Sequence, residues 1–239
     1  MALAGMYHHF QPIVALNTGD IVGYEALLRI RGRSTQAVLA ELCRRGDGDL
    51  LRALDEQSVR IAAAVARSSL PRGGLLFVNL THASVEALVD GAAPPPTAGL
   101  RVVWELAESA ATSALLARPG ALEALVRRLP VALDDVGDGH ADLGRLAEGV
   151  RLGVSWIKVA RSVIDGCAAD AGRLAVLRSI AALGVPVVAE GAERSADVAA
   201  VGAAGVSHVQ GFVLGRPGSA RVAETEPRPS LASAPPPAP

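Results

Sequence analysis

Two adjacent carboxylates, Asp134 and Asp135, follow directly on the apolar run 131–133. Burial of that run would carry both acids to the edge of a hydrophobic core, where neighbouring like charges are costly unless something neutralises them. Two carboxylates at consecutive positions can share divalent cations, with one of them bridging two ions. The pair therefore predicts metal chemistry.

Other short apolar runs also meet a polar side chain at or near their C-terminal ends, at steps of about one strand–helix unit. In a barrel of parallel strands such positions converge on one rim, where barrel enzymes carry their chemistry. Each acid alone could be an ordinary solvated residue, but their common placement by chance is improbable. The residues are Glu25, Asn79, Glu105, Asp134 with Asp135, Lys158, Glu190 and Gln210.

This set contains carboxylates and an amide but no cysteine or histidine. Such hard oxygen ligands favour Mg²⁺ or Mn²⁺ over zinc. Two such ions about 4 Å apart serve phosphoryl chemistry, because they stabilise both the attacking and the leaving oxygen. The pattern thus predicts a two-metal site.

Two kinds of segment alternate along the chain and must position these residues. Short, β-branched apolar runs predict strands at 21–30, 74–80, 100–108, 131–136, 156–160, 185–192 and 208–214. Helical periodicity predicts helices at 50–70, 121–129, 141–150, 171–184 and 195–205. Alternation of this kind indicates an α/β fold with a parallel sheet buried on both faces, and favours a (β/α)8 TIM-like barrel. A doubly wound open sheet is the alternative, although its usual glycine-rich phosphate loops are absent.

Composition limits the partners. The chain has 239 residues, of which 50% are hydrophobic and 3% aromatic, and its formal net charge is −1. Without a long Lys or Arg run, nothing attracts it electrostatically to a nucleic acid polymer or an anionic membrane. Cys43 and Cys167 lack CxxC partners, which suits buried thiols in a reducing compartment. With neither signal-peptide features nor a long apolar stretch, a cytoplasmic protein is expected. We expect one domain over 1–222 and a disordered Pro/Ala-rich tail over 223–239.

Seven ordered motifs carry a family resemblance. They are FQPIVALNTGDIVGYEALLR (10–29), FVNLTHAS (77–84), VVWELAES (102–109), LDDVGDG (133–139), IKVARS (157–162), VVAEGAE (187–193) and VQGFVLGRP (209–217). With them the chain resembles the EAL-domain cyclic di-GMP phosphodiesterases, as a stand-alone EAL domain with partly divergent motifs. The resemblance implies a barrel whose modified first strand runs antiparallel to the others. It also implies hydrolysis of cyclic di-GMP to linear pGpG with two Mg²⁺ or Mn²⁺ ions, and a homodimer.

The resemblance also implies roles for individual residues. The first ion would be held by Glu25, Asn79, Glu105 and Asp134, and the second by Asp134, Asp135 and Glu190. Lys158 and Glu190 would be catalytic, with the lysine orienting the attacking water. Substrate contacts would come from Arg29, Gln11 and Gln210, and Glu108 would support the loop after the paired aspartates.

Three departures from the family pattern bear on activity. Ala160 stands where the family has an aspartate two residues after the lysine, and the loop 136–140 reads VGDGH, with Asp138 in place of a small hydroxyl residue. Phe212 replaces the commoner tyrosine, with little expected effect. The alternative function is therefore a catalytically weakened EAL protein that binds cyclic di-GMP or a regulatory protein partner. An enolase-type barrel lyase would also use rim acids and a lysine, but it does not explain the adjacent aspartates.

Overall fold

A computed structural model describes residues 4–71, 73–97, 99–107, 114, 117–137 and 143–220. The expected tail at 223–239 lies outside these residues. The strands are β1 (Met6–Ala15), β2 (Ile21–Ile30), β3 (Leu75–Leu80), β4 (Arg101–Ala107), β5 (Val131–Val136), β6 (Trp156–Val159), β7 (Val187–Ala189) and β8 (His208–Val209). The helices are α1 (Thr35–Arg45), α2 (Gly48–Ser69), α3 (His82–Val89), α5 (Ala121–Val126), α6 (Leu143–Leu152), α7 (Arg161–Ile164), α8 (Ala171–Ala181) and α9 (Ser195–Ala203), with a 3-10 turn, η1, at Cys167–Ala169.

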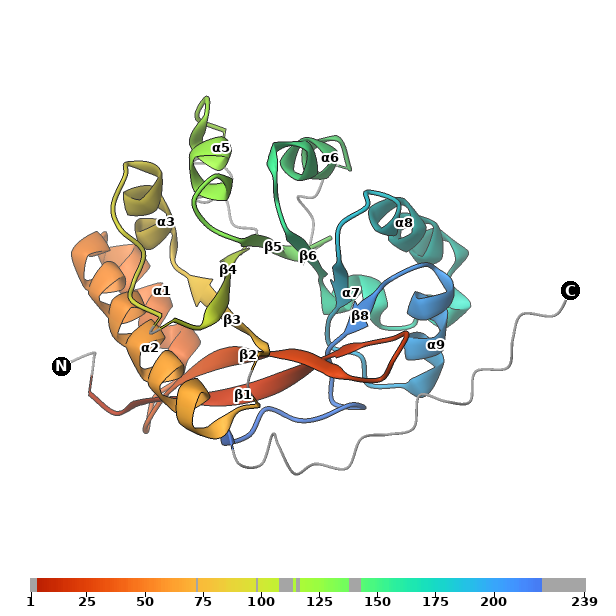
Figure 1. Ribbon diagram of the computed structural model, residues 1–239, viewed down its shortest axis with the longest axis horizontal. Helices are drawn as coiled ribbons and strands as arrows, with labels where there is room; N and C mark the ends of the chain where they lie inside the picture. The colour runs from red at the N-terminus through yellow and green to blue at the C-terminus, as the bar shows by residue number, and fades with distance from the viewer. Residues whose placement is uncertain are drawn as a thin grey trace, which may run out of the picture.

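The strands form a closed barrel in the order β1 to β8, with the helices outside it (Figure 1). β1 pairs antiparallel with both β2 and β8, whereas each later strand pairs parallel with the next. The predicted (β/α)8 barrel with an antiparallel first strand is confirmed. An open doubly wound sheet is excluded, because the sheet closes.

The barrel interior is a packed core beneath the rim. Its central cluster contains Ile13, Phe77, Val103, Ala132 and Val188, each no more than 1% exposed. Such layered apolar side chains make a barrel solid rather than a pore. The polar residues of the strand ends therefore lie directly above a packed layer of apolar side chains.

The sequence patterns did not predict β1 or the helical elements α1, α3, α7 and η1. β1 is not a continuous apolar run, because partly exposed positions such as Tyr7 and His9 alternate with the buried His8 and Phe10. α1 and α3 are short helices that were not predicted. α1 is nevertheless well delimited, with the Ser34 side chain accepting from the backbone N–H of residue 37 and a left-handed glycine after its last turn.

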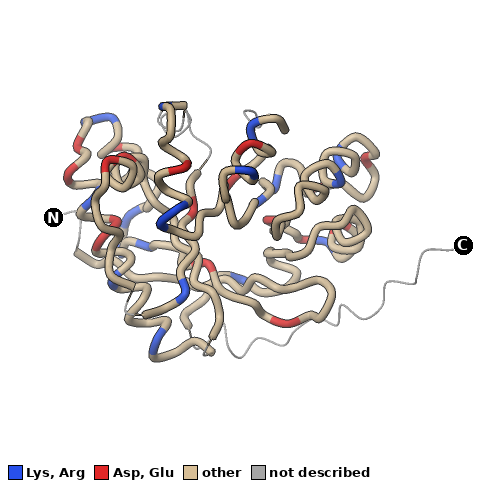
Figure 2. Tube along the Cα trace, turned by 45° about the horizontal axis from the view of Figure 1, so that its top comes forward, with Lys and Arg blue, Asp and Glu red and all other residues tan. Residues whose placement is uncertain are grey.

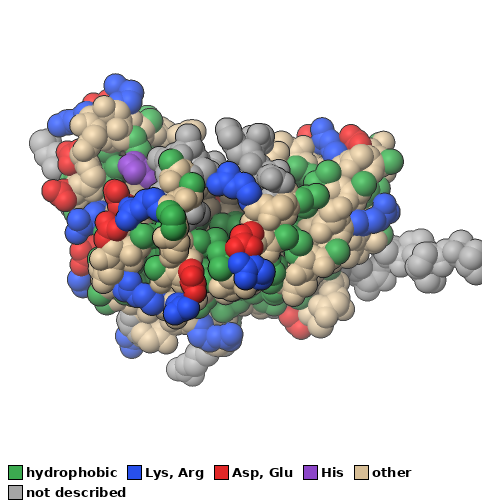
Figure 3. Space-filling view, turned by 90° about the horizontal axis from the view of Figure 1, so that it is seen from above, with side chains coloured by type: hydrophobic (Ala, Val, Ile, Leu, Met, Phe, Trp, Pro, Cys, Tyr) green, Lys and Arg blue, Asp and Glu red, His purple; other side chains and the backbone are tan. Residues whose placement is uncertain are grey.

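Charges are spread over the outside of the barrel. Figure 2 shows Lys and Arg interspersed with Asp and Glu along the helices, and Figure 3 shows both signs breaking up the hydrophobic surface of one face. Among the described residues, no helix has the length and apolar character needed to span a membrane. Both signs of charge thus lie side by side on the faces that these views show.

Candidate metal and substrate site

Lys158 occupies the centre of the predicted rim cluster. It is the only lysine in the sequence, and it is 0% exposed. β6 delivers its ammonium group to four carboxylates from four other strands or strand ends. The Nζ atom lies 2.6 Å from Glu105 Oε1, 2.7 Å from Glu190 Oε1, 3.0 Å from Asp134 Oδ1 and 3.4 Å from Glu25 Oε2. The structure thus brings together five of the residues that the sequence placed at one rim.

Two amides orient Glu25 from either side. Asn79 Nδ2 donates to Glu25 Oε1 at 2.9 Å, and Gln210 Nε2 donates to Glu25 Oε2 at 2.6 Å. Gln210 also donates to Gln11 Oε1 at 3.1 Å, and Gln11 Nε2 donates to the Gly215 carbonyl at 3.0 Å. Both glutamines are buried, so these bonds give them a clear role in holding Glu25. Their contact with substrate stays a prediction.

Glu25 differs from its predicted placement at a strand end. It lies in the middle of β2, because β1 and β2 extend well past the other strands as a two-stranded ribbon. The pairing of Glu25 with Phe77 on β3, and of Asn79 with Glu105 on β4, sets these polar residues at adjacent levels. A long strand can therefore contribute a rim residue from its middle.

Burial and the neighbouring charges change the pKa values of the residues in this cluster. Burial raises the pKa of Glu105 well above its ordinary value, and the Glu25 carboxylate adds to the rise. Burial likewise raises the pKa of Glu190 well above its ordinary value. Burial acts to lower the pKa of Lys158, but the surrounding carboxylates outweigh it and raise that pKa well above its ordinary value. One ammonium thus faces more acid groups than it can neutralise.

Asp135 has an unusual backbone that explains how consecutive aspartates can serve one site. Neighbouring strand residues normally point to opposite faces of a sheet. Asp135 has φ 58°, the only positive φ among described residues other than glycine, and the β5–β6 register shifts between Leu133 and Val136. At this bulge the oxygens of Asp134, Asp135 and Glu190 lie within 4.8 Å of one another. The local distortion gathers both carboxylates.

The donor set fits hard divalent cations. Asp134, Asp135 and Glu190 can each offer one oxygen to a common ion, and Asn79 and Glu25 lie in direct contact nearby. Glu105 Oε2 is buried and has no hydrogen-bond partner within the described part of the chain. A buried carboxylate oxygen in that state is available as a ligand. Oxygen donors without sulfur or imidazole suit Mg²⁺ or Mn²⁺.

Arg29 lies near the far end of the β2 ribbon and is half-buried. Its Nη1 donates to the adjacent Leu28 carbonyl at 2.9 Å. On β2 it shares a face with Glu25, four residues away, so it stands above the carboxylates at the mouth. This position is compatible with the predicted phosphate contact.

Ala160 begins α7 directly after β6. It is 2% exposed, and no side chain caps the first turn of that helix. Its backbone N–H donates to the Val136 carbonyl at 2.9 Å, which ties it to the end of β5. A carboxylate here would lie close to the Asp134–Asp135 bulge, so the departure from the family pattern falls beside the predicted metal ligands.

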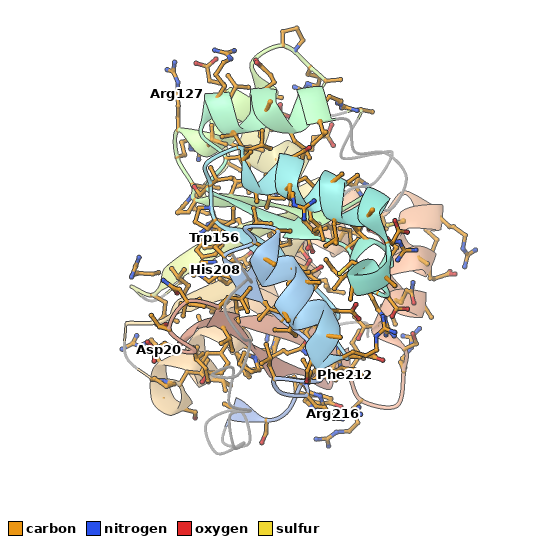
Figure 4. All side chains as sticks on the ribbon, turned by 90° about the vertical axis from the view of Figure 1, so that its right-hand side faces the viewer. Asp20, Arg127, Trp156, His208, Phe212 and Arg216 are labelled. Atoms are coloured by element: carbon orange, nitrogen blue, oxygen red, sulfur yellow. The ribbon has the colours of Figure 1, made fainter. Side chains whose placement is uncertain are left out.

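Some predicted features fall outside the described residues, namely Glu108 and, in the altered loop, Asp138. Phe212 is described, and it is 44% exposed with the Arg216 guanidinium carbon 4.4 Å from its ring centre. Figure 4 shows this pair on the opposite side of the barrel from Trp156 and His208. This cation–π pair gives the position a contact that the sequence did not predict.

Comparison with known proteins agrees with this geometry. The model of the EAL domain family matches residues 2–217. The bifunctional diguanylate cyclase/cyclic di-GMP phosphodiesterase MucR of Pseudomonas aeruginosa is 30% identical over 231 residues, which are 87% of this chain and 32% of that protein. The chain spans about a third of the length of the curated relatives that it matches over most of its own length.

Solved structures share the fold. The PaMucR phosphodiesterase in complex with c-di-GMP has a TM-score of 0.72 and 28% identity, covering 90% of this chain and 97% of that one. Klebsiella pneumoniae BlrP1, in a manganese/cy-diGMP complex, has a TM-score of 0.74 and 24% identity, covering 93% and 58%. By the family match across nearly its whole length, this chain belongs to the EAL domain family.

Proposed function

We propose that this chain is a cyclic di-GMP-specific phosphodiesterase that hydrolyses cyclic di-GMP to linear pGpG by a two-metal mechanism. The observation that carries the proposal is the convergence of Glu25, Glu105, Asp134 and Glu190 on Lys158, with Asp135 turned toward the same place. The relatives support the substrate, because MucR is named as a cyclic di-GMP phosphodiesterase and its phosphodiesterase structure is a c-di-GMP complex. Family membership leaves the enolase-type lyase without support.

In this mechanism the acids hold two Mg²⁺ or Mn²⁺ ions. Glu25, Asn79, Glu105 and Asp134 would hold one ion, and Asp134, Asp135 and Glu190 would hold the other. Divalent cations in such a site lower the pKa of a water molecule and stabilise charge on both reacting oxygens. The manganese in the BlrP1 complex supports this choice of metal.

Lys158 acts as a fixed positive charge. The carboxylates around it raise its pKa well above the ordinary value, which favours the charged ammonium form. It can donate hydrogen bonds that hold the attacking water and offset negative charge on the phosphate. Fixing the water lowers the entropic part of the barrier.

Gln210, Gln11 and Arg29 complete the proposed site. The two glutamines hold Glu25 in place, and their substrate contact is part of the proposal. The forked guanidinium of Arg29 suits a phosphate at the mouth. A homodimer and a regulatory protein partner are further proposals that rest on the family resemblance alone.

A second candidate is a weakened EAL protein that binds cyclic di-GMP without useful turnover. The observation that favours it is Ala160, which leaves no acid at the start of α7. Purified protein with cyclic di-GMP and Mn²⁺ separates the two, if pGpG is followed by chromatography and binding is measured independently. Product that disappears in Asp134→Asn supports the enzyme. Binding without product overturns it in favour of the second candidate.

A further inference from the structure

The inner face of the β1–β2 ribbon forms one wall above the carboxylates. Gln11 pairs with Glu25, His9 with Leu27, and Tyr7 with Arg29. Side chains at alternate strand positions share a face. Because Gln11 is bonded to Gln210 inside the barrel, His9 and Tyr7 continue the same inner face toward the mouth.

The exposure of β1 is one-sided. His8 and Phe10 are buried, and His8 Nε2 lies 2.9 Å from the Ser58 hydroxyl of α2, so that face packs beneath the helix. On the other face, Tyr7 is 40% exposed and His9 is partly exposed. The exposed rings therefore belong to the mouth side and not to a frayed strand end.

Tyr7 and His9 form an aromatic pair. Their ring centroids are 5.5 Å apart with an interplanar angle of 69°. At about 3.4 Å of rise per residue, His9 stands about 7 Å along the strand from Gln11. A purine attached through its ribose to a phosphate at the carboxylates spans such a distance. Arg29, directly across from Tyr7, places a cation beside the same space.

We propose that one guanine of cyclic di-GMP binds against the Tyr7–His9 pair, here called the platform, stacking on the face of one ring and meeting the edge of the other, and that the pair determines affinity for a purine substrate. This inference rests on the proposed function, because it takes cyclic di-GMP as the ligand. An exposed aromatic surface beside a cation is the usual means of holding a base by its π-face, and single stacked bases contribute enough to change affinity by about tenfold or more. No metal ligand is involved.

The test compares flat with branched side chains at both positions. Tyr7→Leu and His9→Leu remove the rings, whereas Tyr7→Phe and His9→Phe restore them without the polar atoms. Affinity for cyclic di-GMP is measured by equilibrium dialysis with Ca²⁺ as the hard divalent cation, and Mn²⁺ affinity is measured by calorimetry for every variant. We expect about a tenfold or greater loss of cyclic di-GMP affinity in each Leu variant, recovery in the Phe variants and unchanged Mn²⁺ affinity.

The outcomes separate this inference from the proposed function. If the unaltered protein binds no cyclic di-GMP, the proposed function is wrong, and the platform, which depends on it, is wrong too. If the unaltered protein binds and both Leu variants bind equally well, the platform is wrong while the proposed function stands. Loss of Mn²⁺ affinity in the Leu variants would also overturn the platform, because the rings would then act through the metal ligands.

Discussion

Lys158 Nζ lies 2.6 Å from Glu105 Oε1, and both side chains are at most 1% exposed. An ion pair of this kind is a poor source of net stability, since both charges lose their hydration, but removing one partner leaves the other charge buried and uncompensated. The stability of the rim therefore depends on keeping these buried charges paired.

Lys158→Met is expected to lower the free energy of unfolding by about 3 to 5 kcal/mol in EDTA, because the four acids lose their shared cation. Added Mn²⁺ should restore part of that stability, since the metal replaces the missing positive charge. Thermal unfolding of both proteins with and without Mn²⁺ measures this. Equal Mn²⁺ effects on variant and unaltered protein would contradict it.

Gln210→Leu is expected to reduce Mn²⁺ affinity and turnover by about 10- to 100-fold, the usual effect of losing a group that orients a metal ligand. It removes the 2.6 Å hydrogen bond to Glu25 while leaving all proposed ligands in place. Gln11→Leu is the matched control, because it acts on Glu25 only through Gln210, and should have a smaller effect. Mn²⁺ affinity is measured by calorimetric titration. Equal losses of affinity in the two variants would contradict the larger role of Gln210.

Asp135→Asn and Asp135→Val separate charge from backbone at the β5 bulge. Asparagine tolerates the left-handed φ of 58°, so we expect weaker Mn²⁺ binding with little change in stability. Valine should lose Mn²⁺ affinity and a further 1 to 2 kcal/mol or so of unfolding free energy, because β-branched residues avoid that region. Urea unfolding in EDTA is the measurement. Equal stability of the two variants would show that the bulge relaxes freely.

Ala160→Asp is expected to raise turnover, since it places an acid beside the proposed metal ligands. It should also stabilise the uncapped start of α7 by roughly 0.5 to 1 kcal/mol. Ala160→Ser is the matched control, because it caps the helix without a charge and should raise stability alone. Rates of pGpG formation decide the matter, and an unchanged rate in the Asp variant would show that this position does not limit hydrolysis.

His8 is expected to make the protein less stable in mild acid. Burial, with a contribution from Arg29, lowers its pKa from 6.5 to about 4. As the pH falls below 6.5, the unfolded chain takes up a proton that the folded chain refuses until about pH 4. Stability from the neutral imidazole is thus complete above the unfolded pKa and is lost as the pH falls through this window, by about 2 kcal/mol between pH 7 and 5.

Urea unfolding of the unaltered protein and His8→Leu at pH 7 and pH 5 measures this contribution. The carboxylates affect both proteins alike, so the difference between their pH slopes reports on His8. Parallel slopes would remove His8 as the cause.

The sequence predicted the barrel and most of the rim because strand–helix alternation and strand-end polarity are local patterns. It did not predict β1 as a run, since half of that strand faces the mouth and is polar or aromatic. The predicted strand 21–30 matches β2, but the placement of Glu25 at a strand end was wrong, because β1 and β2 extend past the other strands as a ribbon. The tie from Gln210 to Glu25 joins opposite ends of the chain, and no local pattern encodes it.

The left-handed backbone of Asp135 was also beyond sequence reasoning, because aspartate adopts ordinary strand geometry equally well. Spacing alone could place Asp134 and Asp135 at a strand end, but not turn both side chains to one side. Tyr7 and His9 were overlooked for a similar reason, since their meaning depends on the pairing with β2. The only signal in the sequence was that Tyr7 and His9 alternate with His8 and Phe10, as side chains on opposite faces of a strand do.

The pairing of β1 with β8, which closes the barrel, has a consequence for folding during synthesis. β1 meets β8 through two residue pairs, and the bonds from Gln11 to Gly215 and from Gln210 to Glu25 span 204 and 185 residues. Glu25 is synthesised 185 residues before Gln210, the amide that bonds it. A nascent or truncated chain that lacks β8 and the residues after it therefore lacks the contacts that hold Glu25 and Gln11 in place.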